Sequence, residues 1–169
     1  LASHQQISNT QPNRLACLSL PTASSTQTAS RKLAWKILSD KWDREPQAPL
    51  MWSEDGSALL CKAEDQGRQH VWRFDMATHQ VSQVIEGGTV HAFDMAAGRL
   101  VSLIDKAVHP GRIQVQGVDE SGHASLPAVS RMESFNDNLL DGIALGATEA
   151  HWFKGCLLYT SDAADEGLG

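Results

Sequence analysis

The sequence has no apolar run long enough to cross a bilayer, which takes roughly 18 to 20 residues, and it has no excess of positive charge. Fourteen Lys and Arg stand against 20 Asp and Glu, giving a formal net charge of −6. The basic residues are scattered singly or in pairs, whereas a nucleic-acid-binding surface needs them clustered to neutralise phosphates. We therefore expect no membrane span and no nucleic-acid partner.

Cysteine is also scarce. The three cysteines (Cys17, Cys61 and Cys156) are far apart in the sequence and form no CxxC pair. An odd number without metal-type spacing favours isolated thiols over a disulfide framework or a zinc site. Histidine pairs of the metalloprotease type, phosphate-binding loops and dinucleotide fingerprints are likewise missing. We expect no metal and no cofactor.

A nucleophile elbow of the form Gly-x-Ser-x-Gly, which presents the serine of α/β-hydrolases, is absent from the sequence. Ser53 and Ser121 belong to predicted hairpin turns that offer no oxyanion hole. Six histidines fall on predicted strands or turns, where a surface side chain is the simplest interpretation: His70, His79, His91, His109, His123 and His151. We predict no catalytic residue in this chain, and the sequence assigns no substrate-binding residue.

What the sequence does have is a succession of short apolar runs bounded by turn residues. Gly, Asp and Thr occupy the turns, as is typical of β-hairpins. Two longer connections are expected at 64–68 and 106–111, and Gly87-Gly88 separates two groups of four runs. The predicted strands are 50–53, 58–61, 70–74 and 81–85, followed by 90–93, 100–104, 113–118 and 126–129.

The second group repeats the first at a period of about 41 or 42 residues. The matching pairs are Trp52 with Phe93, Gly56 with Gly98, and Val71 with Ile113. A four-stranded unit at this period is typical of a propeller blade. The predicted fold class is all-β, a partial β-propeller of four-stranded antiparallel blades; an open meander or a sandwich is the alternative. The tryptophans are expected to pack in the core or between blades: Trp35, Trp42, Trp52, Trp72 and Trp152.

Several segments resemble known propellers. The run 52–56, Trp-Ser-Glu-Asp-Gly, resembles the Trp-Ser-x-Asp-Gly turn of bacterial propellers, including the TolB-like group. The run 41–44, Lys-Trp-Asp-Arg, resembles an element that precedes a blade in bacterial acylaminoacyl- and dipeptidyl-peptidases. The run 78–81 resembles an Ala-Thr-Gly-Lys-Val turn in which His79 replaces the usual glycine, at some cost in turn propensity.

The most specific resemblance begins at Phe135-Asn-Asp-Asn-Leu-Leu140 and continues through 142–146 and Glu149 to Trp152-Phe-Lys-Gly155. It is similar to the passage by which peptidases of the prolyl oligopeptidase family leave their last blade. The resemblance covers 39–155 and points to the bacterial dipeptidyl aminopeptidase or acylaminoacyl-peptidase type.

This resemblance implies a parent enzyme with a Ser-His-Asp triad on a separate α/β-hydrolase domain. The parent would hydrolyse short peptides, and its propeller would restrict access to the triad. The present chain would be a non-catalytic part of it. The alternative is a TolB-like or WD-type propeller that serves as a protein-binding scaffold. Of the bacterial periplasm and cytoplasm, the periplasm is slightly favoured as the compartment.

The expected organisation has four parts. Residues 1–38 are a degraded or partial blade, in which 23–30 departs from the family and suggests a slip of the reading frame. Residues 39–130 are two blades, and 131–155 lead towards a missing hydrolase domain. The tail 156–169 resembles the translation of a sequencing-library adapter and is left out of fold reasoning. We also expect the true start to lie upstream of Leu1.

Overall fold

The structure is a computed structural model that describes residues 12–18, 35–146, 148–149, 151–154 and 160–163. Strands β3 (Gln47–Trp52), β4 (Ala58–Asp65), β5 (Arg68–Asp75) and β6 (Val81–Ile85) form one antiparallel sheet in chain order, called here the first blade. Strands β7 (Thr89–Ala96), β8 (Arg99–Lys106), β9 (His109–Val118) and β10 (Ala124–Arg131) form a second sheet of the same order, called the second blade.

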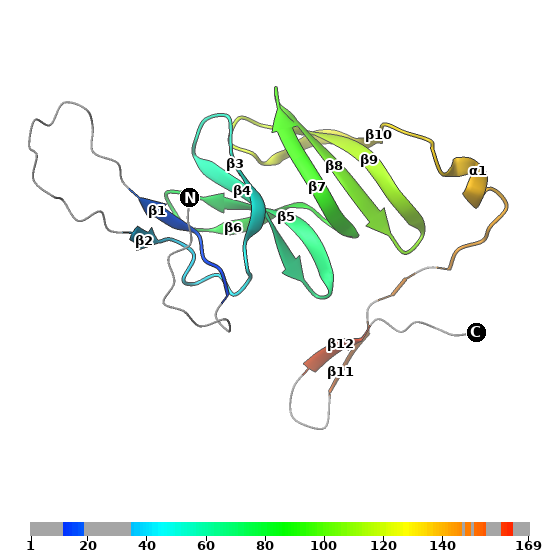
Figure 1. Ribbon diagram of the computed structural model, residues 1–169, viewed down its shortest axis with the longest axis horizontal. Helices are drawn as coiled ribbons and strands as arrows, with labels where there is room; N and C mark the ends of the chain where they lie inside the picture. Colours follow the sequence, from blue (N-terminus) through cyan, green and yellow to red (C-terminus); the bar gives the residue numbers. More distant parts are fainter. Residues whose placement is uncertain (1–11, 19–34, 147, 150, 155–159, 164–169) are drawn as a thin grey trace, which may run out of the picture.

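The smaller elements lie at either end of the chain. Strands β1 (Ala16–Leu18) and β2 (Trp35–Ile37) pair with each other and precede the first blade in the sequence, and α1 (Asp137–Leu140) follows the second blade. Strands β11 (His151–Lys154) and β12 (Thr160–Ala163) pair with each other, apart from the blades in Figure 1. The predicted all-β class with four-stranded antiparallel units is confirmed. Most of the tail 156–169 lies outside the described ranges. Residues 23–30, where a slip of the reading frame is predicted, lie wholly outside them.

The two blades repeat at the predicted period. Strands β4 and β8 begin 41 residues apart, and so do β5 and β9. The proposed match of Trp52 with Phe93 is wrong in register. Trp52 pairs with Leu59 in the first blade, whereas Met95 pairs with Leu100 at the corresponding place in the second. The β3–β4 turn spans 53–57 and the β7–β8 turn only 97–98, so a count along the sequence slips by two residues there.

The two predicted connections are also shorter than expected. Strand β4 runs on to Asp65, and Gln66-Gly67, both with positive φ, turn the chain into β5. Lys106 still belongs to β8 and pairs with His109, which leaves a two-residue turn. Cross-strand pairing stabilises polar strand ends that composition alone assigns to loops.

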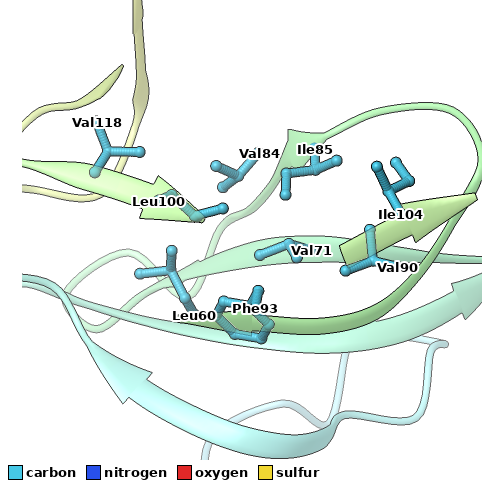
Figure 2. Packing of buried hydrophobic residues seen from close by; sticks show 9 residues of the cluster. All are labelled: Leu60, Val71, Val84, Ile85, Val90, Phe93, Leu100, Ile104 and Val118. Carbon is cyan, nitrogen blue, oxygen red and sulfur yellow. The ribbon is translucent and has the colours of Figure 1, made fainter. Parts of the chain in front are cut away.

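The main core lies between the blades. The first blade packs one face, its forward face, against the rear face of the second blade, and Figure 2 shows the side chains that meet there. The cluster consists of Leu60, Val71, Val84 and Ile85 from the first blade and Val90, Phe93, Leu100, Ile104 and Val118 from the second. Each fully buried aliphatic side chain contributes about 1.5–3 kcal/mol, so this interface joins the two blades into one folding unit.

The rear face of the first blade is covered by a different set of residues. Leu15, Leu38 and Trp42 pack against Leu59 and Phe74 in a second core cluster. Residues 12–18 and 35–45 therefore act as a cover for this face. Of the tryptophans, Trp42 is buried and meets Trp72 edge-on at 6.0 Å between ring centroids. Trp35 is half-buried. Trp52 is 51% exposed, although burial in the core or between the blades was predicted. The Trp152 side chain lies outside the described part.

Candidate functional site: the junction between the blades

The Trp-Ser-Glu-Asp-Gly turn is a self-capped loop. Asp55 Oδ1 accepts hydrogen bonds from Ser53 Oγ and from the Ser57 main-chain N–H, each at 2.8 Å. Ser53 Oγ in turn accepts from the Ala58 N–H at 2.9 Å, and Gly56 takes a φ of +71°. The bonds from Ser57, first its N–H, hold the pKa of Asp55 below the ordinary value. These residue types therefore have a structural reason to recur in this turn.

The β5–β6 turn is built in the same way around Asp75. Its Oδ1 accepts from the N–H groups of Ala77 and Thr78 and from Thr78 Oγ1. These bonds, led by the Thr78 N–H, lower the pKa of Asp75 to about 2. His79 takes the predicted glycine position with a φ of +59°, and its ring lies 5.6 Å from that of Phe74. The turn keeps its shape at the cost of left-handed backbone on a bulky residue.

The β9–β10 turn brings a serine, a histidine and an aspartate together. Ser121 Oγ donates to Asp119 Oδ1 at 2.8 Å and lies 2.9 Å from His123 Nδ1. In a catalytic triad the carboxylate and the serine contact opposite nitrogens of the imidazole; here both face Nδ1, because His123 Nδ1 lies 3.5 Å from Asp119 Oδ2. The Asp119 carboxylate also accepts the His123 N–H, which holds the pKa of Asp119 below its ordinary value. This cluster has the geometry of a turn and not of a triad.

The three turns and the neighbouring strands are tied across the junction by hydrogen bonds to main-chain carbonyls. Arg73, with a side chain only 6% exposed, pairs with Asp75 and donates from Nε to the Ser121 carbonyl at 2.6 Å. The Asp55 N–H donates to the Glu120 carbonyl at 3.0 Å. Further along, Lys62 Nζ donates to the His91 carbonyl at 2.7 Å, and Gln116 Nε2 to the Val84 carbonyl at 3.1 Å.

Sequence reasoning gave Arg73 and Lys62 no role. The sequence signal that could have singled them out is a long basic side chain on the mixed polar and apolar face of a strand. Gly122 completes the junction, because a Cβ at this position would come within 2.9 Å of Leu60 Cδ1. The β9–β10 turn of the second blade can therefore lie directly on the core of the first.

Two cavities flank Trp52. One, of about 200 Å³, is lined by Trp52, Glu54, Met95 and Asp119 among others and opens where the two blades meet. The other, of about 330 Å³, is apolar and lies between the β1–β2 pair and the first blade; Cys17, Trp35 and Met76 line it with Trp52. Glu54 stands in the β3–β4 turn and Asp119 in the β9–β10 turn. Neither cavity brings a nucleophile and a base together.

Two histidines are buried, contrary to the prediction that all six are on the surface. His70 on β5 is 7% exposed, its Nδ1 lies 2.6 Å from Gln83 Nε2, and its Nε2 has no hydrogen-bond partner in the described part of the chain. Burial lowers the pKa of His70, against the opposing pull of Asp65. His109 is also 7% exposed, with Nδ1 2.9 Å from the Pro110 carbonyl. Each of these two histidines can be buried because one of its ring nitrogens has a nearby hydrogen-bond partner.

The Trp-Asp-Arg element ahead of β3 anchors the cover to the first blade. Trp42 lies in the rear-face cluster, and Arg44 Nη2 pairs with Asp65 Oδ1 at 2.7 Å at the end of β4. Arg14 donates from Nη1 to the Trp42 carbonyl at 3.0 Å. The motif therefore fixes the entry of the chain into β3.

The segment after the second blade presents its apolar side chains to solvent. Arg131 pairs with Asp137 and so holds the start of α1 near the end of β10. Phe135 is 80% exposed, Leu139 72% and Ile143 54%. A chain segment with this many exposed apolar side chains is typical of one that packs on another surface.

Among the described residues, no three His, Cys, Asp or Glu side chains are grouped so that they could hold a metal ion. Within the same ranges, no helix has both the length and the apolar character that crossing a membrane requires. The predictions of no catalytic, cofactor-binding or nucleic-acid-binding residue stay predictions.

The fold defines a chain built from repeated four-stranded antiparallel blades. A solved structure with this arrangement is the acylaminoacyl peptidase of Pyrococcus horikoshii, which superimposes with a TM-score of 0.52 at 18% sequence identity. The match covers 76% of this chain and 19% of the peptidase, so the chain spans about a fifth of the length of that protein. At this identity the likeness concerns the fold. No protein-family model matches the chain, and no curated protein matches it significantly.

Proposed function

We propose that this chain is part of the β-propeller of a serine peptidase of the prolyl oligopeptidase family, of the dipeptidyl aminopeptidase or acylaminoacyl-peptidase type. The observation that carries the proposal is the agreement of two independent likenesses. The fold of 76% of the chain superimposes on an acylaminoacyl peptidase, and the passage from Phe135 to Gly155 resembles the exit from the last blade in that family.

In this proposal the propeller does no chemistry itself. It would limit access of substrates to a triad on an α/β-hydrolase domain, so that short peptides are the substrates of the whole enzyme. The exposed side chains of Phe135, Leu139 and Ile143 support a segment that leads to, and packs against, such a domain. The boundaries at about 39, 131 and 156 belong to the same proposal.

The first test is the nucleotide sequence downstream of the codon for Gly155 in the source DNA. The proposal expects an open reading frame that encodes a Gly-x-Ser-x-Gly elbow, followed in order by Asp and His. A further blade and then a stop codon would instead support the scaffold alternative of the TolB-like or WD type and overturn the peptidase.

The second test is enzymatic. The purified chain is expected to leave aminoacyl and peptidyl p-nitroanilides intact, whereas the extended protein hydrolyses them and is inactivated by a serine-directed organophosphate. Ser121→Ala is the matched control, because Ser121 is the serine that lies against a histidine in the described turns. Turnover by the purified chain that Ser121→Ala abolishes would contradict the absence of a triad.

A further inference from the structure

Trp52 lies at the end of β3 with about half of its surface in solvent. It is 51% exposed, whereas a tryptophan normally buries most of its large apolar area. Met95 occupies the corresponding place in the second blade, and both side chains line the cavity of about 200 Å³ where the two blades meet. Packing between the blades gives no reason for a tryptophan at this position. The exposed indole is available as one wall of a binding site.

Two carboxylates line the same cavity from turns of different blades. Glu54 belongs to the β3–β4 turn and Asp119 to the β9–β10 turn. The Asp55 N–H donates to the Glu120 carbonyl at 3.0 Å, so a main-chain hydrogen bond joins the neighbours of the two lining residues. Asp55 and Asp119 also accept bonds within their own turns. The backbone of both turns is therefore fixed before a ligand arrives, which lowers the entropic cost of binding.

Neither carboxylate is neutralised by a lysine or an arginine in the part of the chain that the structure describes. Glu54 has no ion-pair partner there, and the one that Asp119 has is His123, whose Nδ1 lies 3.5 Å from Oδ2. The hydrogen bonds that the Asp119 side chain accepts from its turn go to Oδ1. A carboxylate has about four acceptor sites, so Oδ2 can still accept from a ligand.

The surroundings of the cavity are acidic as well. Four turns lie at this end of the blades, and with the adjoining strand residues they span 53–57, 75–80, 96–99 and 119–123. These ranges contain one basic side chain, Arg99, and five acidic ones: Glu54, Asp55, Asp75, Asp119 and Glu120. The nearby Arg73 is almost buried and already pairs with Asp75. A surface with an excess of one sign attracts ligands of the opposite sign.

We propose that this cavity binds the guanidinium group of an arginine side chain that a peptide presents. A planar guanidinium can lie on the indole face of Trp52 and donate from its edge to Glu54 and Asp119. An ammonium group is a compact, strongly hydrated charge, which loses more hydration against the apolar wall of Trp52 and Met95. Pockets for drug-sized ligands have volumes of about 300–1,000 Å³, so the smaller cavity suits a single side chain.

The inference goes beyond the proposed function. It concerns a site at the junction of two blades, built from residues that have no part in peptide hydrolysis. It holds whether the parent protein is a peptidase or a binding scaffold, and its failure would leave the peptidase proposal unchanged.

The test titrates the full chain, labelled with 5-fluorotryptophan, and follows the ¹⁹F signal of Trp52, which is assigned by its loss in Trp52→Phe. The probe is N-acetylarginine methylamide, with the lysine and norleucine counterparts as comparisons. We expect the arginine probe to shift the Trp52 signal in a saturable manner. The lysine probe should bind at least about twofold more weakly and the norleucine probe at least about fivefold more weakly, because they lack first the planar fork and then the charge.

Two variants separate contact in the cavity from the general negative charge of this end. Glu54→Gln should raise the dissociation constant of the arginine probe about two- to fivefold. Glu120→Gln is the matched control, because Glu120 is equally exposed in the neighbouring turn but does not line the cavity. It should change the dissociation constant less than about twofold. Unchanged ¹⁹F signals of the other tryptophans in the free variants show that both are folded.

Four results would overturn the inference. The first is a Trp52 signal that the arginine probe does not shift. The second is equal affinity for the norleucine probe, which would make the cavity a purely apolar site, and the third is equal affinity for the lysine probe, which would remove the guanidinium assignment. The fourth is an equal loss in Glu54→Gln and Glu120→Gln, which would mean that the probe responds to the surface charge and not to the cavity.

Discussion

Replacing Gly88 by alanine separates backbone strain from steric overlap at the start of the second blade. Gly88 precedes β7 with a φ of +73°. A Cβ at this position would overlap the main-chain oxygen of Asp105 and lie 2.9 Å from Lys106 Cγ and 3.1 Å from Ile104 Cγ1. Neither the β8 backbone nor the fully buried Ile104 can move away without disturbing the core between the blades.

The matched control is Gly56→Ala. Gly56 has nearly the same φ, +71°, but no atom lies within 4 Å of a Cβ built there. An alanine in the left-handed region costs about 1–2 kcal/mol, which is the whole effect expected at Gly56. At Gly88 overpacking adds about 1–3 kcal/mol. We therefore expect Gly88→Ala to lose about 2–5 kcal/mol, a large part of the free energy of unfolding of a typical domain.

Urea unfolding followed by tryptophan fluorescence and circular dichroism measures both variants. The midpoint should fall much further for Gly88→Ala than for Gly56→Ala, with the denaturant slope unchanged. Equal losses for the two variants would refute the close approach of Gly88 to β8. A smaller loss for Gly88→Ala would refute it more strongly.

Four further perturbations follow from the turns and the core. His79→Gly should raise the free energy of unfolding by up to about 1 kcal/mol, because glycine relieves the positive φ; a decrease, measured by urea unfolding, would mean that ring contact with Phe74 outweighs the strain. Because the pKa of Asp75 is about 2, below its ordinary 3.8, the folded protein should lose stability as the pH falls from about 4 towards 2. The urea midpoint of Asp75→Asn should depend less on pH in this range. An equal pH dependence for the two proteins would contradict the hydrogen bonds that Asp75 accepts in its turn. The pKa of His70 is lowered from its ordinary value of 6.5, so the folded protein should lose stability as the pH falls below 6.5. The urea midpoint of His70→Gln should depend less on pH in this range. An equal pH dependence for the two proteins would mean that the His70 ring is exposed to solvent. Leu60→Ala should cost about 2–5 kcal/mol in the same assay, and a loss below 1 kcal/mol would contradict burial between the blades.

The sequence was sufficient to predict the eight strands of the two blades and most of their turns because these signals are local. Apolar runs such as 100–104 are bounded by residues whose side chains cap their own turns, as Asp75 and Asp119 do. The repeat then follows from spacing. The predicted match of Trp52 with Phe93 is wrong because the β3–β4 and β7–β8 turns differ in length. A count along the sequence does not show which residues pair across strands.

The sequence carries no signal for the acceptors of the contacts across the junction. Arg73 and Lys62 reach main-chain carbonyls, and every residue has a carbonyl, so the acceptor leaves no trace in the sequence. Burial of His70 similarly depends on Gln83, on the neighbouring strand. Interactions of these kinds depend on how the sheets pack, and composition or periodicity does not report them.

The choice of carbonyl acceptors at the junction has a consequence for how such chains change over time. Because Lys62, Arg73 and Gln116 each donate to the backbone of the opposite blade, substitutions at their acceptor residues leave these bonds intact. The acceptor residues of one blade can therefore change without a compensating change in the donors of the other. An interface of this kind allows a repeat protein to diversify blade by blade.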